Sequence, residues 1–394
     1  MFPKLRFKEF DENWKEVTLK NCITSIDSGW SPQCESYPAN SSEWGVLKTT
    51  SVDWSGFNSS FNKKLPLELT PRKEIEVKPL DILVTRAGPT ERVGVVSVVP
   101  HSVRSKLMIS DKLIRLKSNE ENNPLFLGIS LSSVKCQNQL QSKTSGLAKS
   151  QTNISQKILG EVLLKLPSKE EQTKIASFLS AVDEKISQLN KKHELLSQYK
   201  QGMMQKLFSQ QIRFKADDGS EFGEWEGKEL HQIFQIKAGG DIEKSSVSEV
   251  RTSEFSYPIF ANSDKNKGFY GWANKFKYKE AVTVTGRGNL GIAVARNEPF
   301  YPIVRLLVLL PLVKQNLKFF EEQINLLDIV SESTGVPQLT APQLSKYKVN
   351  VPSLEEQTKI ANFLSSIDQK IEVVAQQIEQ AKQWKKGLLQ QMFI

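Results

Sequence analysis

The segment EEQTKIA occurs twice in this chain, at Glu170–Ala176 and again at Glu355–Ala361. The match extends over residues 167–208 and 352–393, and about half of the aligned positions are identical. Such a long match indicates an internal duplication. The chain must therefore fold in a way that uses the same long segment twice, which limits the possible architectures more than composition does.

Each copy has the sequence pattern of a long helix. Ser168 with Glu171, and Ser353 with Glu356, have the spacing of a capping box, in which the Glu carboxylate returns to the amide of the cap residue. Downstream, apolar residues recur in rows seven positions apart, as in a coiled-coil seam. The rows are Ile175, Val182, Leu189, Leu196 and Met203 with Leu179, Ile186 and Leu207, and then Ile360, Ile367, Val374, Ala381 and Leu388 with Leu364, Ile371, Ile378 and Met392.

Helices of this kind, about forty residues long, would measure ~60 Å, and neither could bury its seam alone. We therefore predict that the two helices pair, in antiparallel orientation. The alternative is that each helix packs only on its own domain. Lys200 and Lys385 interrupt the seam at equivalent positions, with His193 one heptad before Lys200. Because a buried Lys is costly unless it is paired or solvated, the seam is expected to open there toward solvent or a partner.

The segments that precede the helices are also related. Arg6 and Trp14 near the start of the first match Arg213 and Trp225 near the start of the second. Later, DILVTRAGPTERVGVVSVV resembles AVTVTGRGNLGIAVA, each with a β-rich run, a turn with Gly and a second β-rich run. We predict an α+β fold with internal pseudo-two-fold symmetry, in which two globular α/β domains are separated by two long antiparallel coiled-coil helices. The expected boundaries are 1–166 and 211–350 for the domains, and 167–210 and 351–394 for the helices.

The charge balance favours an anionic partner. The net charge is +9 and the isoelectric point is near 9.2, which fits nucleic acid without requiring it. The longest apolar run, Pro302–Val313, is interrupted by Arg305 and Pro311, so it predicts one or two buried strands rather than a membrane span. Three widely spaced cysteines and no signal-like start indicate a cytoplasmic protein.

Several short motifs resemble those of enzymes, but the sequence around them does not fit an enzyme site. Gly286–Gly291 fits G-x-G-x-x-G, but a β-like run follows it instead of a helix, so a tight hairpin turn is expected. The NEPF segment at Asn297–Phe300 has Glu298 where the adenine methyltransferase motif has its first Pro. No Walker A sequence occurs, and the three histidines and three cysteines support neither a zinc site nor a catalytic triad.

With these features in place, the chain resembles the specificity subunit of type I restriction–modification enzymes. The segments LPSKEEQTKIASFLSAVDEKI and VPSLEEQTKIANFLSSIDQKI match the helix signature of that family, and TGVPQLT at 334–340 is typical of the end of its target recognition domains. SGLAKSQTNI in the first domain departs from that form. The resemblance covers the whole chain and is most specific in the helices.

The resemblance implies a non-catalytic DNA-binding subunit with no cofactor of its own. Each domain would read one half of a bipartite, asymmetric target on double-stranded DNA, and the helices would set the spacer. Two methyltransferase subunits would dock on the helices, and restriction subunits would join the full complex. S-adenosylmethionine, ATP and magnesium would bind those partners.

Polar and basic turn segments are the predicted DNA contacts, because Arg can read guanine, and Asn or Gln adenine, in the major groove. We expect phosphate contacts to outnumber base contacts among them. The candidates are Arg86, Thr90, Arg92, Lys143, Ser145, Lys149 and Gln151 in the first domain, and Lys265, Asn266, Lys267, Tyr270, Arg287, Asn289, Thr334 and Gln338 in the second.

The sequence leaves two other functions open. In the first, the chain is a coiled-coil interaction scaffold without DNA specificity. In the second, it is a DNA-modifying enzyme with unfamiliar motifs. The sequence does not reveal the target bases, because readout depends on loop geometry and DNA deformability.

Overall fold

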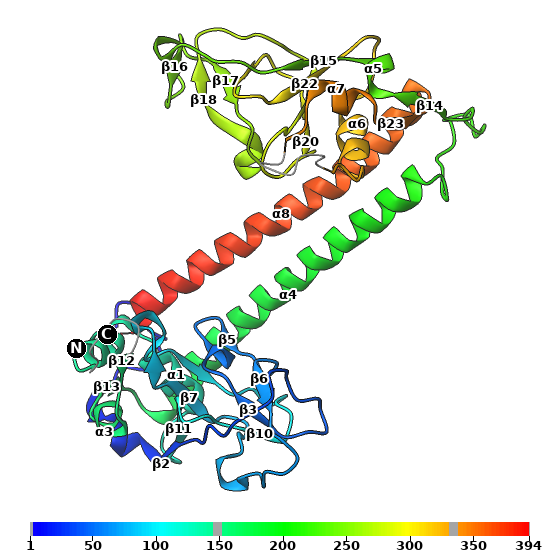
Figure 1. Ribbon diagram of the computed structural model, residues 1–394. Helices are drawn as coiled ribbons and strands as arrows, with labels where there is room; N and C mark the ends of the chain where they lie inside the picture. The colour runs from blue at the N-terminus through cyan, green and yellow to red at the C-terminus, as the bar shows by residue number, and fades with distance from the viewer. Residues whose placement is uncertain (1–2, 145–151, 331–337, 394) are drawn as a thin grey trace. The chain divides into compact units, whose positions relative to one another are not determined.

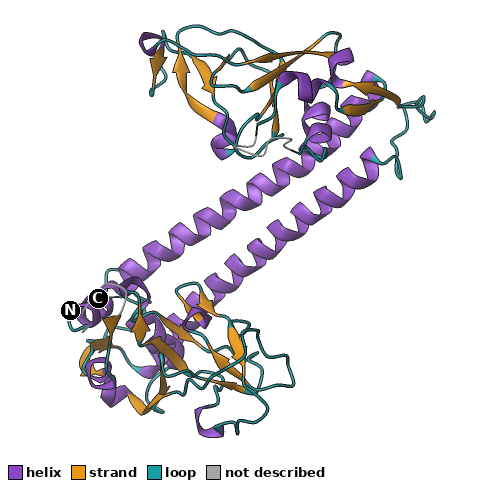
Figure 2. Ribbon diagram, in the orientation of Figure 1, coloured by secondary structure: helices purple, strands orange, loops and turns teal. Residues whose placement is uncertain are grey.

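The computed structural model describes residues 3–144, 152–330 and 338–393 (Figure 1). The chain forms two compact units, which we call unit 1 (residues 1–189 with 377–394) and unit 2 (residues 190–376). Each unit contains one globular domain and segments of two long helices, α4 (Lys169–Phe208) and α8 (Leu354–Met392). The predicted α+β fold with a long central helix and a long C-terminal helix is confirmed (Figure 2). No helix of the described part is long and apolar enough to cross a membrane.

Unit 1 is built on a four-stranded antiparallel sheet whose strands are fully or partly buried. Residues Ile82–Thr85 are buried throughout, as expected for a central strand without an exposed face. The order in this sheet is β2 (Ile23–Ser28), β11 (Leu113–Ser118), β7 (Ile82–Thr85) and β9 (Val96–Val98). Helix α1 (Pro124–Leu131) packs on β9, where Gly128 leaves no room for a side chain: a Cβ there would lie 2.4 Å from Val98 Cγ2.

Unit 2 repeats this sheet with the same strand order. Its strands are β15 (Phe234–Ala238), β22 (Leu307–Pro311), β19 (Ala281–Val284) and β20 (Ala293–Arg296), and α6 (Leu317–Ile324) packs on β20. The duplication predicted from the helices therefore extends to the core of both domains. The run at 302–313 forms the end of one strand and another whole strand, as predicted.

Each unit has a second, mixed sheet, which contains one parallel pair of strands. In unit 1 its order is β10 (Leu107–Met108), β3 (Gly45–Leu47) and β6 (Asn62–Lys64). In unit 2 it is β16 (Val247–Ser248), β18 (Phe269–Ala273), β17 (Tyr257–Phe260) and β21 (Tyr301–Pro302).

Short antiparallel pairs lead from each domain into its helix. They are β1 (Lys15–Thr18) with β13 (Leu163–Leu166), and β14 (Glu226–Glu229) with β23 (Lys348–Val351). The remaining elements are β4 (Val52–Asp53), β5 (Gly56–Phe57), β8 (Ala87–Gly88), β12 (Thr152–Asn153), α2 (Val134–Gln141), α3 (Gln156–Gly160), α5 (Leu230–Ile233) and α7 (Ala341–Ser345).

The heptad rows are buried or partly buried in both helices. In unit 1 the start of α4 and the end of α8 join the domain core through Ile175, Leu179 and Leu388, among others. In unit 2 the end of α4 and the start of α8 do the same through Leu207, Ile360 and Leu364. Within each unit the beginning of one helix thus shares a core with the end of the other, as antiparallel pairing requires.

The repeated EEQTKIA segment forms the joint between each domain and its helix. Ser168 Oγ accepts from the Glu171 amide at 3.4 Å, and Ser353 Oγ accepts from the Glu356 amide at 3.3 Å, so the cap residues are as predicted. The predicted role of the Glu side chains is wrong, because these carboxylates bind Arg and Trp side chains of the domain opening instead of the cap amides.

The contacts of the two carboxylates are the same in both units. Arg6 donates through Nε and Nη2 to Glu171, both at 2.7 Å, and Trp14 Nε1 donates to Oε1 at 3.4 Å. Arg213 donates to Glu356 at 3.0 and 2.7 Å, and Trp225 Nε1 donates at 3.0 Å. We call these two clusters the domain–helix joints.

The Gln that follows this Glu in each copy of the repeat binds the N-cap residue of a helix in the domain. Gln172 Oε1 accepts from the amide of Asn123, and Gln357 Oε1 accepts from the amide of Asn316, both at 3.0 Å. The two Asn residues are the N-caps of α1 and α6, so each long helix fixes the start of the helix that packs on the domain sheet.

The lysines of the seam are paired and partly exposed to solvent. Lys385 Nζ lies 2.5 Å from Asp183 in unit 1, and Lys200 Nζ lies 2.7 Å from Asp368 in unit 2. Lys200 also lies 2.9 Å from the buried Glu322. Pairing reduces the cost of placing Lys there, and the Lys385 side chain, 29% exposed, also keeps contact with solvent as expected.

Candidate nucleic-acid interface

The predicted turn of unit 1 joins β7 to β9 and is held by its first residue. Thr85 Oγ1 accepts from the Val95 amide at 2.9 Å, and its carbonyl accepts from the Gly94 amide at 2.9 Å. Gly94 has φ +84°, a left-handed conformation that favours glycine. The turn between them carries Arg86 and Thr90 on a fixed backbone.

The equivalent turn of unit 2 joins β19 to β20 in the same way. Thr285 Oγ1 accepts from the Ile292 amide at 3.0 Å, and its carbonyl accepts from the Gly291 amide at 2.9 Å, with φ +81° at Gly291. The antiparallel strands on both sides confirm that GRGNLG is a hairpin turn rather than a dinucleotide-binding loop. This turn is shorter than that of unit 1 and carries Arg287 and Asn289.

Each turn lies beside a segment from the end of its domain. In unit 1, β12 pairs with β8, and the Ile154 amide donates to the Arg86 carbonyl at 3.0 Å. In unit 2, Gln338 forms a β-bridge with Arg287, and the Leu339 amide donates to the Gly286 carbonyl at 2.9 Å. We call each turn with its neighbouring segment a paired turn. The structure thus brings together two candidate segments that are far apart in each half of the sequence.

In unit 1 side chains from both segments meet, and in unit 2 the neighbouring segment meets Arg305 from the link before β22. Arg86 Nε donates to Asn153 Oδ1 at 3.4 Å in unit 1, and Thr90 Oγ1 lies 2.7 Å from Thr152 Oγ1. In unit 2, Gln338 Oε1 accepts from Arg305 Nη1 at 3.3 Å. Each paired turn thus contains an arginine beside an amide side chain, and these are the residue types that read guanine and adenine.

Asn262 holds the second paired turn in place. Its Oδ1 accepts from the amides of Gly286 and Arg287 at 2.6 and 3.2 Å, and its Nδ2 donates to the Arg287 carbonyl at 2.8 Å. Arg287 Nε is buried and has no hydrogen-bond partner among the described residues. A buried donor without a partner is costly, so a ligand oxygen or nitrogen would satisfy it.

The predicted segment at 265–270 lies at the end of β17 and leads into β18. Asn266 and Lys267 have left-handed backbone conformations, with φ 48° and 51°, and Tyr270 is 60% exposed. Arg296 Nη2 donates to the Lys267 carbonyl at 2.5 Å while its guanidinium lies 3.6 Å from the centre of the Phe260 ring. Burial lowers the pKa of Arg296 to about 10, which leaves it charged at neutral pH. Arg296 therefore supports this exposed, basic segment from inside the domain.

One predicted contact has a structural role. Arg92 donates from Nη1 to Asp53 at 2.6 Å, and from Nη2 to the carbonyls of Val52 and Thr49 at 2.6 and 3.2 Å. Its guanidinium ties the turn to the β4 region. DNA contact by Arg92 stays a prediction, and it would require the guanidinium to bind DNA while it keeps some of these hydrogen bonds. Lys143 is exposed beyond the end of α2. Ser145, Lys149, Gln151 and Thr334 lie outside the described residues.

Sequence reasoning missed Asn153, Asn262 and Arg305. Arg305 stood in a run assigned to buried strand, but it has φ 60° and occupies the link before β22. Asn153 adjoined a predicted segment and could have been found by aligning it with Gln338. Asn262 gave no signal, because its partner turn is more than twenty residues away in sequence.

Metal-dependent chemistry finds no support in the described residues, which hold no group of three or more His, Cys, Asp or Glu side chains able to bind an ion. The exposed Glu226 and Lys228 of the E-x-K segment form an ion pair with each other at 2.7 Å on β14. The paired turns offer hydrogen-bonding and charged groups suited to recognition of a polar, anionic ligand.

Comparison with known proteins agrees with this geometry. The sequence pattern of the type I restriction modification DNA specificity domain matches twice, at residues 12–197 and 223–383. A type I restriction enzyme specificity subunit (EcoEI) of Escherichia coli is 40% identical over 171 residues, which are 43% of this chain and 29% of that protein. A putative type I specificity subunit of Mycoplasma pneumoniae is 30% identical over 219 residues, 55% of this chain and 58% of the relative. These two matches thus span less than two thirds of each relative.

Solved structures share the fold along the whole chain. The type I restriction–modification S subunit from M. genitalium aligns with a TM-score of 0.66 at 18% identity, and covers 100% of this chain and 99% of its own. A chain from a study of complex assembly in a type I restriction–modification system aligns with a TM-score of 0.56 at 17% identity, with 98% of both chains covered. The two matched domains and the shared fold together show that this chain belongs to the family of type I restriction–modification DNA specificity subunits.

Proposed function

We propose that this chain is the non-catalytic DNA-reading subunit of a type I restriction–modification complex. Each domain would read one half of a bipartite, asymmetric target through its paired turn. The observation that carries this proposal is that the same backbone device occurs in both domains with different side chains. A repeated reader with changed contacts suits two different half-sites.

We infer that the helices separate the two half-sites. Each long helix has about forty residues, 40 in α4 and 39 in α8, and a helix of that length exceeds one turn of DNA, ~34 Å. Bases between the half-sites would then be contacted only at phosphates or through DNA shape.

The duplicated helices support two copies of one partner, which we take to be the methyltransferase subunit. That subunit would bind S-adenosylmethionine, and restriction subunits would bind ATP and magnesium. The chain itself would then hold no cofactor.

Co-expression with the cognate methyltransferase subunit, followed by genome-wide mapping of methylated adenines, tests the proposal. The expected result is a split motif with a fixed gap. Arg86→Ala should then alter only one half of that motif, and Arg287→Ala only the other half. A contiguous motif, or no motif at all, would contradict bipartite reading.

The same reagents separate the two alternatives. A scaffold without specificity would bind random and target duplexes alike, with the same dependence on salt. A DNA-modifying enzyme would methylate DNA without the partner when supplied with S-adenosylmethionine.

A further inference from the structure

Helices α1 and α6 correspond residue by residue, which allows the two units to be compared at single positions. Their N-caps, Asn123 and Asn316, both donate their backbone amides to the Gln of the repeat. Three residues on, Phe126 and Phe319 both pack against the Trp of the joint, with ring centroids 5.9 Å apart in each case. Residues at equal distances from the two N-caps are therefore equivalent.

In unit 2 one face of α6 is charged and meets the long helices. Lys318 Nζ lies 2.7 Å from Glu322 and 3.2 Å from Asp368, and Lys200 completes the network from α4. Burial would lower the pKa of Lys318, but the charges and hydrogen bonds of Glu321 and Glu322 raise it above its ordinary value. This side of unit 2 is closed by a paired ionic network.

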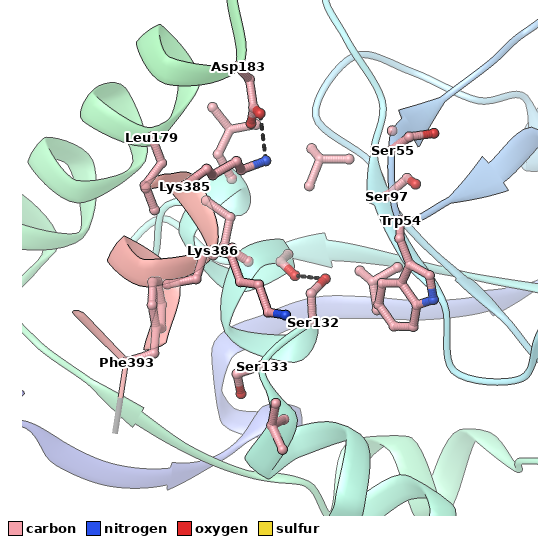
Figure 3. A pocket seen from close by; sticks show the side chains of 18 of the residues that line it. Trp54, Ser55, Ser97, Ser132, Ser133, Leu179, Asp183, Lys385, Lys386 and Phe393 are labelled. Atoms are coloured by element: carbon pink, nitrogen blue, oxygen red, sulfur yellow. Dashed lines mark hydrogen bonds and ion pairs between the residues drawn. The ribbon is translucent and has the colours of Figure 1, made fainter. Parts of the chain in front are cut away.

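In unit 1 the equivalent positions are Leu125, Gly128 and Ile129, and a cavity of about 670 Å³ lies beside them (Figure 3). The ion pair of Asp183 with Lys385 remains, but no charged residue of α1 joins it. The other walls are Val96 and Val98 of β9, Trp54 and Gly56 of the β4–β5 turn, Leu179 of α4, Leu389 and Phe393 of α8, and residues 133–135 and 138 of α2.

The rim of this cavity is basic. Lys386 and Lys135 line it, and no ion pair is found for either within the described ranges. The two carboxylates of the lining are engaged, Asp53 with Arg92 and Asp183 with Lys385. Trp54 is 50% exposed at the opening. An occupant would therefore have an apolar body and a negative charge beside it.

We propose that the two docking sites for the methyltransferase subunit are unequal, and that the first copy binds unit 1 by inserting an apolar side chain, flanked by a carboxylate, into this cavity. The inference rests on the proposed function, in which one partner binds twice on the duplicated helices. Leu179, Asp183, Lys385 and Leu389 belong to those helices, so a partner seated on them reaches the cavity directly. In unit 2 the ionic network of Lys200, Lys318, Glu322 and Asp368 occupies the equivalent positions, so an apolar side chain placed there would have to displace paired charges.

The test grafts the charged residues of unit 2 into unit 1. In Leu125→Lys with Ile129→Glu, the new pair can join Asp183 and Lys385 as Lys318 and Glu322 join Asp368 and Lys200. The matched control is Leu67→Lys with Thr70→Glu, which adds the same charges at exposed positions away from the cavity. Trp54→Ala, at a half-exposed position, serves if the graft fails to fold.

Titration of the full chain with purified methyltransferase subunit, followed by native mass spectrometry, gives the two dissociation constants. The dissociation constant of the first step should be at least ~10-fold lower than that of the second. A buried apolar anchor at an interface contributes enough binding free energy for a change of this size. The graft should reduce this ratio to about 4-fold, the statistical ratio of the two steps for two equal independent sites. Trp54→Ala should weaken only the first step, and the control should change neither.

Hydrogen exchange of the one-to-one complex identifies the site filled first. Protection is expected at residues 124–133 rather than at 317–324. A ratio of only about 4-fold between the two steps in the unmodified chain, protection at 317–324, or an unchanged first step in both cavity variants would overturn the inference while leaving the proposed function standing. Absence of any binding would instead overturn the docking role itself.

Discussion

The two domain–helix joints use the same residues, whereas the two paired turns share only their backbone. In the joints, an Arg and a Trp from each domain opening hold a Glu of each long helix with nearly equal distances. In the paired turns, the Thr and Gly anchors recur, but the side chains between them and the turn lengths differ. The contacts that join domain to helix were therefore kept in both units, while the candidate reading surfaces diverged.

The largest expected effect is on the joints. Glu171→Ala and Glu356→Ala each remove one partner of a buried, hydrogen-bonded ion pair, and both carboxylates are at most 1% exposed. Breaking such a pair costs about 3–5 kcal/mol. Urea unfolding followed by hydrogen exchange should show similar losses, each confined to its own unit, with Glu170→Ala as the exposed control. Unequal losses would break the claimed equivalence of the joints.

The next largest effect concerns the paired turns, whose side chains differ between the two units. Arg287→Ala should weaken binding of the assembled complex to its target duplex by ~1–3 kcal/mol and relax discrimination at one position of one half-site. Competition binding with single-base variants of the target measures both quantities. Lys275→Ala, at an exposed position of the same domain, is the control. If affinity and discrimination are unchanged, Arg287 is not a base reader.

The helix caps should again behave alike. Ser168→Ala and Ser353→Ala each remove an N-cap acceptor, which costs about 1 kcal/mol. The same urea and hydrogen-exchange measurement applies, and Ser180→Ala in the middle of α4 should have a smaller effect. A cap that matters in only one unit would show that the two helix starts are not under the same constraint.

The smallest effect concerns the pH dependence of the ionic network in unit 2. Burial would raise the pKa of Asp368, but the hydrogen bonds and charges of Lys200 and Lys318 hold it below its usual range. Its contribution to stability is therefore fully present above the unfolded-state pKa of ~3.9, and is lost as pH falls through the folded-state value. The stability difference between the natural chain and Asp368→Asn should shrink as the pH is lowered from ~6 to ~3. A pH-independent difference would contradict this assignment.

Much of the architecture could be predicted from sequence because it depends on local repetition. The heptad rows from Ile175 and Ile360 onward, the cap serines and the hairpin after Thr285 are short-range patterns with few alternatives. The Glu171 carboxylate was assigned to the wrong partner because its true partners, Arg6 and Trp14, are distant in sequence. The composition of the turns named the candidate segments. It did not show which of these segments lie side by side in the fold.

The tandem duplication, with its two long helices and two related domains, could be read from the amino-acid sequence alone, because identical residues repeated in register impose the same helix twice. The positions of Arg86 beside Asn153 and of Gln338 beside Arg287, and the role of Asn262 in holding the second paired turn, follow only from the folded structure. It also decided that unit 1 has an apolar cavity where unit 2 has an ionic network. Contacts between segments remote in sequence depend on how strands and helices pack, and no local pattern records that packing.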